Sequence, residues 1–181
     1  MKKLVFAITM CMAAMNANSQ VITSKTIDNV YEKVINQTSG NLVYHAERTQ
    51  GNITTMYTYQ KVSTPQGEVT LKPSLKHEYT YTPDDMLSSR VTYRWSNEQN
   101  SWLCVARLNY TLTDDSYCAE YSRYNHETHR SEQPQERMVY ALYLDDAVNY
   151  ITYYHRDDTL SPFRLVSQVV VNDQPLLYAM K

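Results

Sequence analysis

The stretch that decides the fold runs from Leu75 to Tyr124 and reads LKHEYTYTPDDMLSSRVTYRWSNEQNSWLCVARLNYTLTDDSYCAEYSRY. Apolar and polar residues alternate along its longest segment, between Trp102 and Leu112. The apolar set is Trp102, Cys104, Ala106, Leu108, Tyr110 and Leu112. A period of two is typical of a strand with one buried face. The stretch therefore predicts four β-strands joined by three turns, with the aromatic side chains largely on one face.

Further strand-like segments lie on both sides of this stretch. We expect strands near residues 53–62, 68–71, 75–82, 87–95, 102–112, 116–125, 136–144, 147–155, 164–171 and 176–179. Pro73 lacks the N–H that a central ladder needs, so it should interrupt the chain between two of these strands. The prediction is an all-β fold, an antiparallel meander of hairpins in one long, twisted sheet. A β-sandwich or barrel is the alternative.

The segment from Val21 to Asn36 fits two structures. Apolar residues at Ile27, Val30 and Tyr31 have helical spacing, and Thr26 could be the N-cap. In the other interpretation residues 30–35 form a strand that turns at residues 36–40 and pairs with residues 41–46. We favour this hairpin, with the short N-terminal helix as the alternative.

The first nineteen residues resemble a secretory signal peptide. Lys2 and Lys3 precede an apolar run, and small residues at Ala17 and Ser19 suit cleavage before Gln20. The run is too short to span a bilayer, so we expect no membrane insertion. We expect a signal peptide at 1–19, a single domain at 20–181, and export to the periplasm, the cell surface or the medium.

The composition narrows the possible partners. Without residues 1–19 the chain has 15 basic and 19 acidic residues, a net charge of about −4, and it has no basic cluster. Nucleic acid is an unsuitable partner, since its binding needs a cationic face. The chain has three glycines, all far apart, so no phosphate-binding loop is expected.

Acidic pairs recur at a regular spacing. They are Asp84-Asp85, Asp114-Asp115 and Asp145-Asp146, separated by 30 and 31 residues, and each lies between two strand-like segments. Calcium binding or acid–base catalysis would use such carboxylates. Asp is also favoured in turns because its side chain bonds the local backbone, and the turn is the interpretation we favour.

The chain resembles a family of secreted Bacteroidetes proteins classed only as a domain of unknown function. The resemblance covers residues 76–166. Its motifs here are Tyr79-Thr80-Tyr81 with Asp84, Tyr93-Arg94-Trp95-Ser96, Trp102, and Leu108-Asn109-Tyr110. Ser96 stands where the family usually has Asn, and the acidic turns lack a following Gly. The resemblance implies an exported β-rich fold and no known activity.

No catalytic, cofactor or metal site is predicted. His126 and His129 are three residues apart and could share a metal with Glu132, but Arg130 and Pro134 mark this segment as an exposed loop. A Gly-x-Ser-x-Gly elbow is missing from the sequence, and no Cys lies beside a His. The cofactor and metal predictions are therefore none.

The aromatic residues give the one functional hypothesis. Tyr93, Trp95, Trp102 and Tyr110 are the candidate ligand-binding residues, since aromatic faces on a sheet stack on sugars or on protein side chains. The same stripe could instead be the core. We expect a non-enzymatic binding or structural module with a glycan or another surface protein as partner. A small hydrolase with a site assembled from distant strands is the alternative.

Two hairpin registers follow from the turns. A two-residue turn at Asp114-Asp115 predicts the pairs Leu112 with Tyr117, Tyr110 with Ala119, Leu108 with Tyr121, Thr111 with Cys118 and Cys104 with Asn125. Cys104 and Cys118 are then too far apart for a disulfide and should stay free. The hairpin before it predicts the pairs Trp95 with Trp102, Tyr93 with Cys104 and Val91 with Ala106. As a clasp on that hairpin, a buried Trp102 should contribute about 3 kcal/mol or more to stability.

Overall fold

The computed structural model describes residues 21–36, 40–143 and 147–170. One helix, α2, covers Ser24–Asn36. The strands are β1 (Leu42–Thr49), β2 (Asn52–Ser63), β3 (Val69–Tyr81), β4 (Leu87–Ser96), β5 (Ser101–Leu112), β6 (Ser116–Asn125), β7 (Arg130–Ser131), β8 (Glu136–Tyr143), β9 (Ala147–His155) and β10 (Arg164–Val170). The expected signal peptide, the Asp145-Asp146 turn and the strand near 176–179 lie outside the described residues. None of the helices in the described part is long and apolar enough to cross a membrane.

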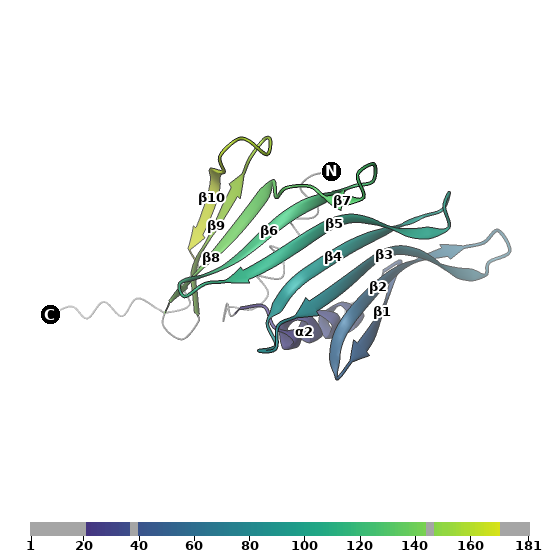
Figure 1. Ribbon diagram of the computed structural model, residues 1–181. Helices are drawn as coiled ribbons and strands as arrows, with labels where there is room; N and C mark the ends of the chain where they lie inside the picture. The colour runs from purple at the N-terminus through teal and green to yellow at the C-terminus, as the bar shows by residue number, and fades with distance from the viewer. Residues whose placement is uncertain (1–20, 37–39, 144–146, 171–181) are drawn as a thin grey trace.

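Within the described ranges the ten strands form one antiparallel sheet in chain order. Each strand pairs with the next, except that β7 pairs only with the end of β6 and β8 continues the sheet beside β6. The sheet is strongly twisted and does not close on itself (Figure 1). The predicted meander is confirmed, and the sandwich and the closed barrel are wrong. β7 is a short addition that the sequence did not indicate.

The hairpin interpretation of residues 21–36 is wrong, because this segment forms α2. The helix begins at Ser24, and the residue before it, Thr23, forms a reciprocal cap with Thr26. The Thr26 N–H donates to Thr23 Oγ1 at 3.4 Å, and the Thr23 N–H donates to Thr26 Oγ1 at 3.2 Å. The helical spacing of the apolar residues places Ile27 in the core with no exposed surface. Burial of the apolar face of α2 against the sheet favours the helix over the hairpin with residues 41–46.

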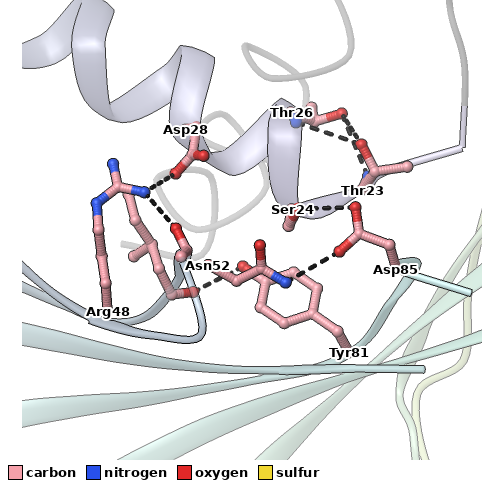
Figure 2. Close-up of polar contacts among 10 residues, drawn as sticks. Thr23, Ser24, Thr26, Asp28, Arg48, Asn52, Tyr81 and Asp85 are labelled. Atoms are coloured by element: carbon pink, nitrogen blue, oxygen red, sulfur yellow. Dashed lines mark hydrogen bonds and ion pairs between the residues drawn. The ribbon is translucent and has the colours of Figure 1, made fainter. Parts of the chain in front are cut away.

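A polar network holds α2 to the β3–β4 turn and to the β1–β2 hairpin (Figure 2). Ser24 Oγ donates to Asp85 Oδ2 at 2.8 Å, and Asn52 Nδ2 donates to Asp85 Oδ1 at 3.1 Å. Arg48 pairs with Asp28 at 2.8 Å. Asp85 has a φ of 65°, a left-handed conformation that Asp tolerates in turns. This acidic pair therefore serves a turn, in agreement with the interpretation we favoured.

Pro73 does not interrupt its strand as expected. β3 runs through it, and the register with β2 shifts between Thr58, which faces Leu75, and Tyr59, which faces Pro73. Ser74 is the extra residue of this β-bulge. The β3–β4 ladder ends at Leu75, so Pro73 has a neighbour on one side only. Proline is tolerated at a bulge near a sheet edge, which explains the continuous strand.

A second bulge, in β5, divides the predicted aromatic stripe between the two faces. Tyr93 faces Cys104 and Trp95 faces Trp102, as predicted, but Ala106 faces Thr92 and not Val91. The extra residue is Val105, and it reverses the alternation of the side chains. Trp102 and Cys104 consequently point to one face, and Ala106, Leu108 and Tyr110 to the other.

The core lies on the face that α2 covers, which we call the helix face. Its buried apolar residues are Val21, Ile22, Ile27, Ile53, Met56, Tyr79, Leu87, Leu108, Tyr110, Tyr117, Ala119, Met138 and Tyr140. Tyr117 is 2% exposed, and its hydroxyl donates to the Leu87 carbonyl at 2.8 Å across three strands. Half of the predicted apolar stripe of β5, namely Ala106, Leu108 and Tyr110, is therefore buried on the helix face.

Candidate ligand-binding face

Six aromatic side chains form a cluster on the opposite side of the sheet, which we call the open face. They are His45 from β1, Tyr57 and Tyr59 from β2, Tyr93 and Trp95 from β4, and Trp102 from β5. Tyr57 alternates with the buried Met56 and therefore points away from α2. The ladders pair Tyr57 with Lys76 and Lys76 with Tyr93, which continues this face across β3 to β4. We call these six residues the aromatic cluster.

Five of the six rings of the aromatic cluster contact one another in a continuous series, and Tyr93 joins them through Lys76. Trp95 and Trp102 meet edge to face, with centroids 5.2 Å apart and planes at 74°. Tyr57 lies 6.0 Å from Trp102, although two strands separate β2 from β5. His45 and Tyr59 each stack on Tyr57, at 6.1 Å and 6.2 Å. His45 is exposed and the others are half-buried, so part of each ring surface remains open to solvent.

Lys76 and Glu78 add a charged pair beside the rings. Lys76 Nζ lies 4.0 Å from the centroid of the Tyr93 ring and 6.0 Å from that of Trp102. It also donates to Glu78 Oε1 at 2.7 Å, while the Tyr93 hydroxyl donates to Glu78 Oε2 at 2.6 Å. The Glu78 side chain is 41% exposed, which leaves a carboxylate accessible at the edge of the cluster.

The hydrogen bonds that Glu78 accepts from Lys76 and Tyr93 keep its carboxyl group ionised. Burial acts to raise the pKa of Glu78, but the hydrogen bonds from Lys76 and Tyr93 outweigh it and lower that pKa. Burial and the hydrogen bond to Glu78 raise the pKa of the Tyr93 hydroxyl. At neutral pH Glu78 is therefore an anion and Tyr93 a neutral donor. The cluster presents apolar ring faces together with one fixed acceptor group and one cation.

Three of the four predicted site residues lie together, namely Tyr93, Trp95 and Trp102. The fourth, Tyr110, is 7% exposed on the helix face, where it stacks on Tyr117 at 5.5 Å. The bulge at Val105 separates Tyr110 from the other three. Strict alternation from Trp102 could not reveal this change of face.

The predicted site residues did not include His45, Tyr57, Tyr59 and Lys76. The alternation of Tyr57 and Tyr59 within β2 was visible in the sequence and indicated a shared face. Their nearness to Trp102 depends on the registers of three successive ladders and on the bulges within them. A long-range register of this kind has no local sequence signal.

Cys104 and Cys118 are free, as predicted, and neither has the properties of an activated thiol. Leu112 faces Tyr117 and Thr111 faces Cys118, as predicted for this hairpin. The ladder ends at Ala106 with Arg123, so it does not include the expected pair of Cys104 with Asn125. Burial raises the pKa of both the Cys104 and the Cys118 thiol. Raised values keep the thiols protonated and weakly nucleophilic at neutral pH.

The two histidines that could share a metal lie in an exposed turn between β6 and β7, as the sequence indicated. The Asn125 side chain accepts hydrogen bonds from the Glu127 and Thr128 N–H groups, so it organises this turn. His129 has a φ of 52°. In the described part of the chain, no three His, Cys, Asp or Glu side chains come together in a way that could hold a metal ion.

A comparison with protein families identifies the relatives of this chain. The model of a family of unknown function, DUF3836, matches residues 1–142, more than half of the sequence. The chain belongs to the DUF3836 family. The sequence resemblance to a family of unknown function agrees with this assignment. The function of the DUF3836 family is described as unknown. A search of curated proteins found no match.

Solved structures of similar fold come from Bacteroides and Parabacteroides. A protein of unknown function from Bacteroides fragilis NCTC 9343 has a TM-score of 0.62 at 16% identity, covering 75% of this chain and 95% of that one. A DUF3836 family protein from Bacteroides vulgatus ATCC 8482 has a TM-score of 0.46 at 23% identity, covering 51% and 89%. One from Parabacteroides distasonis ATCC 8503 has a TM-score of 0.48 at 15% identity, covering 55% and 89%. The first of these supports the fold.

Proposed function

We propose that the protein is an exported, non-enzymatic binding module of the periplasm or cell surface, and that its aromatic cluster binds a glycan. The observation that carries this proposal is the series of half-buried rings on the open face, with Lys76 and Glu78 beside them. The signal-peptide pattern of residues 1–19 supports export.

The chemistry of the aromatic cluster suits a sugar. The C–H face of a pyranose packs against an aromatic ring, while its hydroxyls need fixed donors and acceptors nearby. Glu78 supplies carboxylate oxygens, and the Lys76 ammonium supplies donors. Both charges are already paired, so a neutral or weakly charged glycan fits better than a strongly charged one. Because several rings are in contact, the cluster fits an oligosaccharide better than a monosaccharide.

A binding screen with matched variants tests this proposal. Purified protein is titrated with neutral oligosaccharides by calorimetry, and each ligand that binds is repeated with Trp102→Ala and with Tyr57→Ala. We expect each substitution to weaken binding at least tenfold, which corresponds to about 1.4 kcal/mol.

Phe163→Ala is the matched control. Phe163 lies between Arg137 and Arg156, at 4.3 Å and 4.7 Å, at the β8–β10 end of the sheet. This variant also loses an aromatic ring but should bind as the wild type does. Glycan binding that survives Trp102→Ala and Tyr57→Ala, or binding of proteins alone, would contradict the proposal.

A further inference from the structure

Arg90 is a buried cation on the helix face of β4. It is 3% exposed, and its Nε has no hydrogen-bond partner. None of the ion pairs found among residues 21–36, 40–143 and 147–170 includes it. A guanidinium removed from water without an anion is strongly unfavourable, so native proteins pair such groups. The Arg90 guanidinium is therefore a buried cation suited to an anionic partner.

Two buried tyrosine hydroxyls on the same face as Arg90 also lack partners in the described structure. Arg90 pairs with Leu108 across the β4–β5 ladder, and Tyr110 is the next residue of β5 on the same face. Tyr110 stacks on Tyr117, which in turn contacts Tyr140 at 5.9 Å. The Tyr110 and Tyr140 hydroxyl oxygens are buried and make no hydrogen bond within the described structure. Buried polar groups without partners are rare in native proteins.

In the described part of the chain, the titratable side chains on which the charge of Arg90 acts do not neutralise it at neutral pH. Its charge acts on His77, Tyr79, Tyr110 and Tyr140, which places it near all four. Burial, with the charge of Arg90, lowers the pKa of His77 to about 3, so this imidazole is neutral. Burial raises the pKa of Tyr79 to about 12 and also raises that of the other two phenols. All four groups are therefore uncharged.

We propose that Arg90, with the hydroxyls of Tyr110 and Tyr140, binds the carboxylate of a ligand that has an apolar body. A guanidinium and a carboxylate match in a planar, two-bond geometry, and a phenol donates to the remaining lone pairs. The core cluster that includes Tyr110 and Tyr140 is otherwise largely apolar, and its buried Leu87, Leu108 and Met138, at most 4% exposed, would form apolar walls for such a ligand. Such walls suit an aliphatic or aromatic carboxylic acid rather than a sugar acid. The site lies on the opposite face from the aromatic cluster and does not depend on the proposed glycan binding.

The test compares octanoate with 1-octanol, which has the same chain without the charge, and with inorganic sulfate. We expect octanoate to raise the melting temperature in a concentration-dependent manner and to give a saturable heat by calorimetry, because a ligand bound only to the folded state stabilises it. 1-Octanol and sulfate at the same concentrations should have little effect. An absent octanoate effect, or an equal effect of 1-octanol or sulfate, would overturn the proposal.

Three variants assign the effect to this site. Tyr110→Phe and Tyr140→Phe remove only hydroxyls that lack partners, so each should keep the melting temperature of the free protein and weaken octanoate binding about tenfold. Arg90→Met keeps much of the side-chain volume, and it should fold with an unchanged or higher melting temperature and lose the octanoate response. A clear loss of stability in Arg90→Met would show that the chain itself supplies the counter-ion, and it would overturn the proposal, as would wild-type octanoate binding in any of the three.

Discussion

Trp102 combines two roles at the residue scale, because it closes the β4–β5 hairpin against Trp95 and also belongs to the open aromatic cluster. A buried clasp predicts a loss of about 3 kcal/mol for Trp102→Ala, whereas a ring that only meets ligand predicts none. The half-burial of Trp102 favours an intermediate loss of about 1–2 kcal/mol. Chemical denaturation measures this, with Trp102→Phe as a control that keeps an aromatic ring. An unchanged free energy of unfolding in Trp102→Ala would mean that the pair is no clasp.

His77 should make the fold sensitive to acid. Burial and the charge of Arg90 lower its pKa from 6.5 to about 3, so the folded state keeps the ring neutral where the unfolded chain is protonated. The unfolded state binds more protons in this window, and the free energy of unfolding therefore falls as the pH drops from about 6.5 to about 3. The slope approaches about 1.4 kcal/mol per pH unit.

A variant isolates the contribution of His77 from that of the carboxylates. In His77→Asn the side-chain amide can still bond Thr92, whose hydroxyl lies 3.1 Å from His77 Nδ1. Its stability profile should lack the His77 component, so the difference between wild type and variant should shrink as the pH falls below about 6.5. Parallel profiles between pH 7 and 4 would contradict the burial of a neutral imidazole.

The cap of α2 is the first feature that matters at the scale of elements. Thr23→Ala removes the side-chain oxygen that accepts from the Thr26 N–H and should cost about 1 kcal/mol of stability. Thr23→Ser keeps the hydroxyl and should stay within about 0.5 kcal/mol of wild type. Urea denaturation distinguishes the two. Equal losses in both variants would assign the effect to the lost methyl group and not to the cap.

The bulge at Val105 is the feature of β5 that separates the core from the aromatic cluster. Val105 is the extra residue, so deleting it leaves a regular ladder in which Cys104 still faces Tyr93, Ala106 still faces Thr92, and both faces are kept. We expect the deletion variant to keep the fold and to lose less than about 2 kcal/mol of stability. Val105→Ala keeps the residue count and should cost about 1 kcal/mol or less. Thermal unfolding followed by circular dichroism compares them, and a deletion that costs more than about 3 kcal/mol would show that Val105 is not the extra residue of the bulge.

At the scale of the whole molecule, local patterns predicted the strands well. The period of two and the Pro, Gly and Asp turns gave the order and approximate bounds of most strands. The register of the β5–β6 hairpin also followed, since its two-residue turn fixes it and no bulge intervenes.

The errors arose where long-range packing decides the structure. The choice of α2 over a hairpin depends on burial of Ile27 against the sheet, and Thr23 replaces Thr26 as its cap. The continuity of β3 through Pro73 depends on a bulge, and so does the place of Tyr110 on the helix face. A bulge adds one residue without a distinctive sequence, so alternation alone could not locate it. This is why three of the four predicted site residues lie together and the fourth does not.

The central claim is that the open face binds a glycan through its aromatic cluster. The chain has two tryptophans, Trp95 and Trp102, and both belong to this cluster. The amide correlation spectrum of ¹⁵N-labelled protein should therefore show two indole signals, which Trp102→Phe assigns. We predict that both indole signals shift together and saturably when a neutral oligosaccharide that binds in the calorimetric screen is added. Two indole signals that stay in place while a glycan binds would contradict it.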